Sequence, residues 1–122
     1  MRKSKVLIFI LSLLAIVCSS YADSKITQRI SQFSNDKVNV WKTVIYHTPE
    51  KKLKMHRHEY DRVVIALTNG TLKITNDKGK VHYFKLVKDE AYYLTKDAPG
   101  EMHSDENIGR HPIKLMVIEL KS

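Results

Sequence analysis

Short runs rich in β-branched and aromatic residues, separated by turns, fill the chain from Lys37 to its C-terminal end. The runs cover residues 37–48, 62–68, 71–75, 80–87, 91–95 and 112–120. Residues of these types favour β-strands because their side chains pack well on a pleated, half-buried surface. Strand-like runs at such close intervals predict an all-β sandwich or barrel.

Two turns between these runs are marked by their composition. Asn69-Gly70 is typical of a two-residue hairpin loop, because glycine adopts positive φ easily. The stretch "NDKGK" around Gly79 predicts a second, longer hairpin.

Ahead of the strands, residues 24–33 have a different pattern. Ile26, Ile30 and Phe33 recur there at helical spacing. This spacing predicts a short amphipathic helix, or an arm, laid over the domain.

The first 22 residues have the organisation of a secretory signal peptide. Three basic residues precede an apolar run over residues 6–17, and small residues follow at Ser20 and Ala22. A membrane anchor is one alternative, but the run is shorter than the roughly 18 to 20 residues that span a bilayer. A lipid on Cys18 is another. We expect cleavage after Ala22, one domain over residues 23–122, and a periplasmic or secreted protein.

The composition of the expected mature chain excludes several classes of function. Its 100 residues are enough for one modest core. The single cysteine, Cys18, lies in the signal peptide, so neither a disulfide nor thiol catalysis is expected. With 18 basic and 13 acidic residues the net charge is +5, and the basic residues are spread among acids without a nucleic-acid motif. We expect no nucleic-acid partner, and no membrane association once the signal is removed.

Three histidines are the candidate metal ligands. His56 and His58 are one residue apart, so both side chains point to the same side of an extended strand. The Pro99-Gly100 turn can bring a further strand, with His103 near its start, alongside the first. Transition-metal sites commonly use three protein ligands plus water, or four. The simpler alternative is that these are solvated histidines with no metal.

These residues, with their neighbours, resemble the two motifs of the cupin superfamily, over roughly residues 40–120. The residues that match at the family's spacing are His56, His58 and Gly70 in the first motif, and Gly100, His103 and Asn107 in the second. The resemblance implies a jelly-roll β-barrel whose metal ligands are the three histidines. It implies a divalent transition metal (Fe, Mn, Zn or Ni) and, by analogy, a homodimer.

The glutamate ligand of the first cupin motif is absent. Its position falls on Val63, or with the shorter family spacing on Arg62. Asp61 shares the parity of Val63, so its carboxylate is a candidate replacement. Arg62 is expected to face solvent or to pair with a substrate carboxylate. The alternation of Val63, Ile65 and Leu67 as one apolar face favours the first alternative.

The resemblance supports two interpretations of function. Cupins without the glutamate include three-histidine non-haem iron dioxygenases, which implies a metal-dependent oxygenase or isomerase acting on a small molecule. The alternative is a non-catalytic cupin that binds a small ligand or a partner in the periplasm. No catalytic residue is assigned, although Asp61, Glu101 and Tyr60 are candidate acids or bases. The remaining histidines, at positions 47, 82 and 111, are not expected to be ligands.

Overall fold

The computed structural model describes residues 27–48 and 52–122. Within these ranges it contains strands and no helix: β1 (Gln28–Ser34), β2 (Val38–Ile45), β3 (Leu53–His56), β4 (Arg62–Ala66), β5 (Gly70–Asn76), β6 (Val81–Leu86), β7 (Ala91–Leu94), β8 (His103–Asn107) and β9 (Ile113–Leu120). All six predicted strand runs are confirmed, as β2, β4, β5, β6, β7 and β9. In the same residues no helix is long and apolar enough to cross a membrane. The predicted signal peptide lies outside the described residues.

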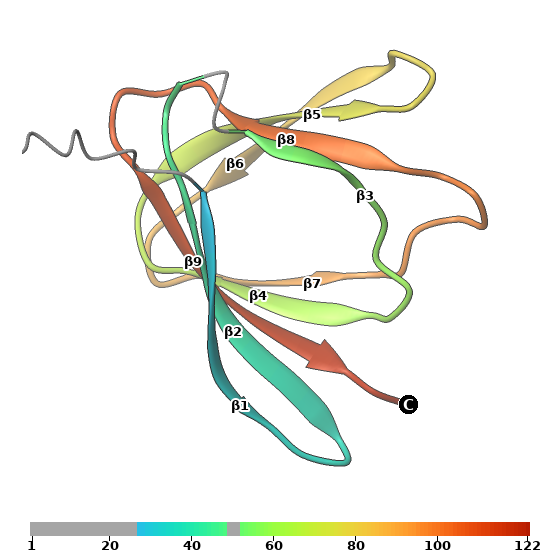
Figure 1. The fold of residues 1–122 in the computed structure, drawn as a ribbon. Helices are drawn as coiled ribbons and strands as arrows, with labels where there is room; N and C mark the ends of the chain where they lie inside the picture. The colour runs from blue at the N-terminus through green and yellow to red at the C-terminus, as the bar shows by residue number, and fades with distance from the viewer. Residues whose placement is uncertain (1–26, 49–51) are drawn as a thin grey trace, which may run out of the picture.

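The strands form two antiparallel sheets that face each other (Figure 1). One sheet has the order β1-β2-β9-β4-β7 and the other the order β3-β8-β5-β6. Strands distant in sequence are neighbours in both sheets, for example β2 with β9 and β5 with β8. This jelly-roll arrangement confirms the predicted fold class.

The hydrophobic core lies between the two sheets. It is built mainly from alternate residues of the central strands, because successive side chains of a strand point to opposite faces. Its buried members are Trp41, Ile45, Val64, Ala66, Leu72, Leu86, Ile113, Leu115 and Val117. The core therefore fills one part of the barrel, and the polar residues described below occupy another.

The prediction of an amphipathic helix near the N-terminal end of the domain is wrong for residues 28–34. These residues form β1, which pairs with β2 along the edge of the five-stranded sheet. Every residue of β1 is exposed, including Ile30 and Phe33, so no apolar face is buried. Pairing with β2 supplies backbone hydrogen bonds that local side-chain spacing does not reveal. Of the two alternatives, the structure agrees with an arm laid along the domain.

The predicted hairpin at Asn69-Gly70 is also wrong. β4 and β5, which flank this dipeptide, belong to different sheets, and positive φ is found at Gly79 and Gly100 but not at Gly70. Glycine is needed at position 70 for another reason. A Cβ there would lie only 2.6 Å from Cδ1 of Ile113, so the close approach of β9 excludes a side chain. The hairpin around Gly79 is confirmed, since it joins the paired strands β5 and β6.

Candidate metal centre

Two neighbouring strands bring the three predicted histidines together. His56 ends β3, His58 follows two residues later, and His103 begins β8. β3 pairs with β8 so that His56 lies directly opposite His103. The predicted turn at Gly100 is present, with φ of 79° and a hydrogen bond from the Glu101 N–H to the Ala98 carbonyl at 3.0 Å. The turn thus returns the chain to place His103 beside the first pair.

One potential ligand atom from each of the three imidazoles lies within 4.8 Å of the other two. The ring centroids of His56 and His103 are 4.5 Å apart, and those of His56 and His58 are 4.9 Å apart. A divalent ion binds imidazole nitrogen at about 2.0 to 2.1 Å, so two nitrogens on one ion are separated by about 4 Å at most. Small side-chain rotations would bring the three nitrogens to that spacing. The group could therefore hold one metal ion.

Hydrogen bonds orient the imidazole of His56. Its Nδ1 lies 2.6 Å from the backbone carbonyl of Lys54, which can only accept a hydrogen bond. In the neutral ring Nδ1 is therefore the nitrogen that carries the proton, which would leave the lone pair of Nε2 available to a metal. Metal-binding histidines are commonly held in position in this way, by a hydrogen bond from the ring nitrogen that does not bind the metal.

Asp97 contacts the other two histidines, at the backbone of His58 and at the ring of His103. Its Oδ2 accepts a hydrogen bond from the backbone N–H of His58 at 2.6 Å and lies 3.5 Å from Nδ1 of His103. Asp97 comes from the loop between β7 and β8, so it connects that loop to both ligand segments. Because Asp97 lies in an irregular loop, no pattern in the sequence marked it as part of the site.

Asp105 lies next to the coordinating side of the histidines. Its Oδ2 is 3.6 Å from Nε2 of His56, and its Oδ1 is 3.8 Å from Nε2 of His103. Asp105 is only 9% exposed, and its Oδ1 has no hydrogen-bond partner among the described residues. Burial raises the pKa of this carboxyl group, although the neighbouring histidines oppose the shift. A signal for Asp105 was present in the sequence, because it follows His103 by two residues on the same face of β8.

Burial also lowers the pKa values of two of the histidines. It lowers the pKa of His58 from 6.5 to about 3, with a further contribution from the positive charge of Arg62. Burial likewise lowers the pKa of His103. Both rings are therefore neutral at pH 7, which is the form that coordinates a metal.

Asp61, the candidate replacement for the missing glutamate, points away from the histidines. Its carboxylate accepts hydrogen bonds from the Tyr93 hydroxyl at 2.7 Å and from the Lys96 N–H at 2.8 Å. These two hydrogen bonds lower its pKa. Asp61 does not line the cavity at the histidines, so it does not take the place of the glutamate.

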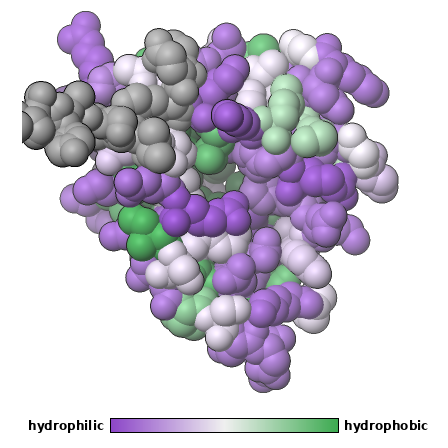
Figure 2. Space-filling view, viewed as in Figure 1, coloured by the Kyte–Doolittle hydropathy of each residue, from purple (hydrophilic) through white to green (hydrophobic). Residues whose placement is uncertain are grey.

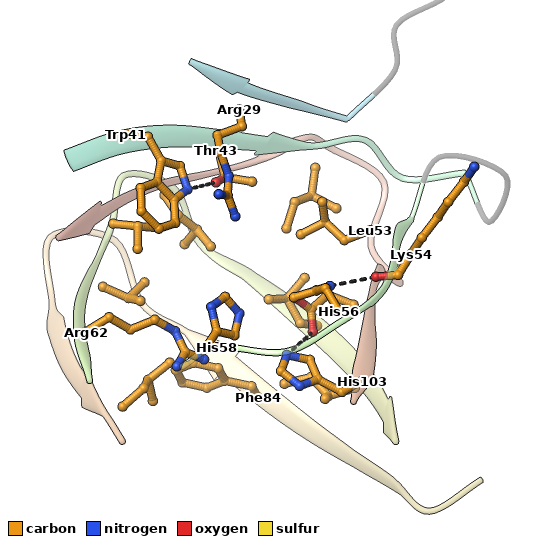
Figure 3. Close-up of a pocket in the computed structure, with 18 of the residues that line it drawn as sticks. Arg29, Trp41, Thr43, Leu53, Lys54, His56, His58, Arg62, Phe84 and His103 are labelled. Atoms are coloured by element: carbon orange, nitrogen blue, oxygen red, sulfur yellow. Dashed lines mark hydrogen bonds and ion pairs between the residues drawn. The ribbon is translucent and has the colours of Figure 1, made fainter. Parts of the chain in front are cut away.

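The prediction that Arg62 faces solvent is wrong. Arg62 is only 8% exposed and shares the inner face of β4 with Val64 and Ala66. A shift of one residue exchanges the two faces of a strand, and the predicted alternation chose the outer face, where Val63 and Ile65 are half-buried. Arg62 therefore projects into the barrel beside His58 (Figure 3).

The histidines open into a cavity of about 320 Å³ between the sheets. Figure 2 shows a largely hydrophilic surface with a hollow in which hydrophobic residues are visible. The cavity wall includes core residues such as Trp41 and Leu115, together with Phe84, Leu94 and two arginines, Arg29 and Arg62. The site thus combines a polar end with an apolar wall.

The other residues considered from the sequence are not part of the histidine cluster, although His82 lines a second pocket that His103 and Arg62 also border. His47, His82 and His111 are exposed, as are Tyr60 and Glu101. His82 lies on β6, which is an edge strand of its sheet. Near the histidines the available carboxyl groups are those of Asp97 and Asp105.

Two facing antiparallel sheets, with a His-x-His pair and a third histidine directed into the space between them, define a cupin. The chain belongs to the cupin superfamily. It is 30% identical over 94 residues to the β-alanine degradation protein BauB of Pseudomonas aeruginosa, a match that covers 77% of this chain and 95% of BauB. No family model matches the chain.

Solved cupin structures have the same fold. A cupin domain from Bordetella pertussis superimposes with a TM-score of 0.68 at 21% identity, covering 80% of this chain and 95% of that one. An RmlC-like cupin with a double-stranded β-helix fold from Methanocaldococcus jannaschii gives 0.59 at 14% identity, covering 81% and 84%. These similarities support the architecture of the barrel.

Proposed function

We propose that this protein is a metal-dependent cupin that binds a divalent transition metal through His56, His58 and His103 and acts on a small molecule in the adjoining cavity. The observation that carries the proposal is the convergence of three imidazoles, from two paired strands, at one end of that cavity. Iron, manganese, zinc and nickel all accept imidazole ligands.

A divalent ion held by neutral imidazoles supplies Lewis-acid or oxygen-activating chemistry, because its charge is not cancelled and coordination positions stay open. The residues around it have their own tasks. Asp97 holds His58 and His103 in position. Asp105, whose pKa is raised by burial, is placed to hold or move a proton beside the histidines. These features favour an oxygenase or isomerase.

The name of the curated relative is consistent with a small substrate. BauB is described as a β-alanine degradation protein. β-Alanine is a small amino acid whose volume is compatible with a cavity of about 320 Å³.

The experiment that tests the metal site is elemental analysis of purified protein after removal of any affinity tag. We expect about one transition-metal ion per chain in the wild type, and loss of most of it in His103→Ala, because one of three ligands is removed. The matched controls are His82→Ala and His111→Ala, whose side chains are exposed, and these should keep the metal. Circular dichroism should show a folded barrel in all variants. Equal metal content in the wild type and His103→Ala would refute the site.

Turnover is tested separately, with the metal-loaded protein. Oxygen uptake, or isomerisation followed by NMR, should be observed with a small-molecule substrate and lost in His103→Ala. If the wild type binds metal and small ligands but catalyses neither reaction, the alternative of a non-catalytic, ligand-binding cupin is correct.

We also propose that the protein is exported to the periplasm or secreted. Support comes from the order of basic, apolar and small residues over positions 1–22. N-terminal sequencing of the protein from an exporting host should give a mature chain that begins at Asp23. A chain that begins at Cys18 and carries lipid would contradict the proposal of a soluble exported protein.

A further inference from the structure

Two arginines from different strands of the five-stranded sheet line the cavity that contains the histidines. Arg29 extends from β1 with its guanidinium 4.0 Å from the centroid of the Trp41 ring, and Arg62 extends from β4 (Figure 3). The stacking on Trp41 holds Arg29 at the wall, so its charge has a partner of its own. Arg62 has a different environment.

The guanidinium of Arg62 has few direct partners in the protein, although the carboxyl groups of Asp97, Asp105, Glu119 and Asp61 stabilise its charge from farther away. The guanidinium donates one hydrogen bond, from Nη1 to the Thr95 carbonyl at 3.3 Å. Among residues 27–48 and 52–122, no carboxylate lies within 4.0 Å of it. A buried charge without a close partner is unfavourable. An arginine also stays protonated at neutral pH, so this side chain favours an anion in the cavity.

The wall of the cavity near Arg62 is apolar. It includes Val64 from the same strand, together with Phe84 and Leu94 from the edge strands β6 and β7. Phe84 is fixed by an edge-to-face contact with Tyr92 at a centroid distance of 5.0 Å. A ligand that reaches Arg62 therefore also contacts hydrocarbon, and a molecule with a charged head and a short apolar body fits both surfaces.

Two observations limit the charge and the size of this anion. The carboxyl groups of Asp97 and Asp105 lie at the same end of the barrel and would repel a doubly charged group. Arg62, Phe84 and Leu94 border this cavity of about 320 Å³ and a second cavity of about 420 Å³. Both volumes are at the small end of ligand pockets, which span about 300 to 1,000 Å³. A monoanion with few carbon atoms is the class that meets both limits.

We infer that the cavity binds a small organic monocarboxylate, with its carboxylate on the guanidinium of Arg62 and its hydrocarbon part against Phe84 and Leu94. The planar guanidinium suits a carboxylate because two parallel N–H groups can donate to its two oxygens. The inference names the substrate class of the proposed metal site and to that extent rests on the proposed function. The pairing with Arg62 itself needs no metal.

Isothermal titration calorimetry with defined probes tests the inference. The zinc-loaded wild-type protein is titrated with butyrate, with the uncharged isostere butyramide, and with inorganic phosphate. We expect butyrate to bind about 10- to 100-fold more tightly than butyramide, since hydrogen bonds to a charged group contribute that much. Phosphate should bind more weakly than butyrate. Equal binding of butyrate and butyramide would overturn the inference, and tighter binding of phosphate would overturn the assignment of a monocarboxylate.

Variants identify the arginine. Arg62→Gln should weaken butyrate binding by about 10- to 100-fold and leave butyramide unaffected. Arg110→Gln is the matched control, because Arg110 is exposed on the loop before β9. If Arg62→Gln does not fold, Arg62→Lys keeps the charge but loses the paired donors, and it should still weaken butyrate binding. Unchanged binding in the folded Arg62 variant would overturn the inference.

The same titrations with metal-free protein separate this inference from the metal site. Without metal, the preference for butyrate over butyramide should persist because Arg62 is still present. If the wild type holds no metal but retains this preference, the proposed metal function fails and the carboxylate site stands. If it holds metal but shows no preference, the carboxylate site fails and the metal function stands.

Discussion

At the scale of single residues, the principal departure from the cupin motif is a change of charge. The position expected for a glutamate ligand falls on Val63 or Arg62, and of these two Arg62 is the one buried beside His58. A cation there disfavours a metal ion through repulsion across a poorly solvated space. The carboxyl groups of Asp97 and Asp105, which lie within 4.0 Å of the histidines, are placed to offset this repulsion. The acidic groups near the histidines therefore come from β8 and the loop before it, and not from β4.

Asp105 is the residue through which this compensation can be tested. Asp105→Asn keeps the size of the side chain but removes a carboxylate that lies 3.6 Å from Nε2 of His56. We expect metal affinity to fall by about 10- to 100-fold, which is typical for loss of a carboxylate partner of the ligands. Titration against a chelator of known affinity measures the change.

The control for Asp105 is Asp61→Asn. Asp61 is bonded to Tyr93 and Lys96 and does not line the cavity, so its replacement should leave metal affinity unchanged. A larger loss in Asp61→Asn than in Asp105→Asn would show that the compensating carboxylate has been misassigned.

At the scale of strands and loops, Asn107 connects the end of β2 to the loop before β9. Its Nδ2 donates to the carbonyls of Ile45 at 2.9 Å and His111 at 2.7 Å, and its Oδ1 accepts from the Gly109 N–H at 2.9 Å. The side chain is only 1% exposed, so none of these groups can readily turn to water. The asparagine of the second cupin motif is therefore structural in this chain.

Asn107→Ala should consequently reduce the free energy of unfolding by about 2 to 4 kcal/mol, because it leaves buried polar groups unpaired. Urea unfolding followed by tryptophan fluorescence measures this. Asn39→Ala is the control, since the side chain of Asn39 on β2 makes no hydrogen bond in the part of the chain that the structure describes. Its expected effect is within about 0.5 kcal/mol of zero. Similar losses in both variants would mean that the bonds of Asn107 do not stabilise the fold.

The strands and loops also differ in how far they could be predicted from the sequence. Strands rich in β-branched residues, such as β2 and β9, were recognisable because composition alone favours them. β8 has the polar sequence HSDEN, and only its histidine and the preceding turn suggested a strand. The inward face of β4 could not be chosen, because apolar residues occur on both of its faces. The prediction for Gly70 was wrong because glycine is needed there to make room for Ile113, which is distant in sequence. Rules for local turns do not include such contacts.

At the scale of the whole molecule, the two sheets divide the interior into an apolar core and a polar end. Burial at that polar end holds His58 and His103 neutral. Such neutral, buried histidines link the stability of the metal-free barrel to pH, because the unfolded chain can take up protons that the folded chain excludes.

The direction in which stability changes with pH follows from the pKa of His58. Its pKa is about 3 in the folded protein and 6.5 ordinarily, so between these values the unfolded state binds more protons. Stability is therefore full above pH 6.5 and falls as the pH drops toward 3. His103 acts in the same direction. The raised pKa of Asp105 acts in the opposite direction, since its folded form binds a proton more readily. With two histidines against one carboxyl group, we expect a net loss of stability.

Thermal unfolding in the presence of a chelator, at several pH values from 7.5 to 5, tests this last prediction. The midpoint of the wild type should fall as the pH is lowered, and the fall should be smaller in His58→Gln, which has no ring to protonate. His82→Gln is the control, because His82 is exposed and its replacement should leave the pH dependence of the wild type unchanged. If His58→Gln loses stability as steeply as the wild type, then His58 is not the group that links folding of the barrel to pH.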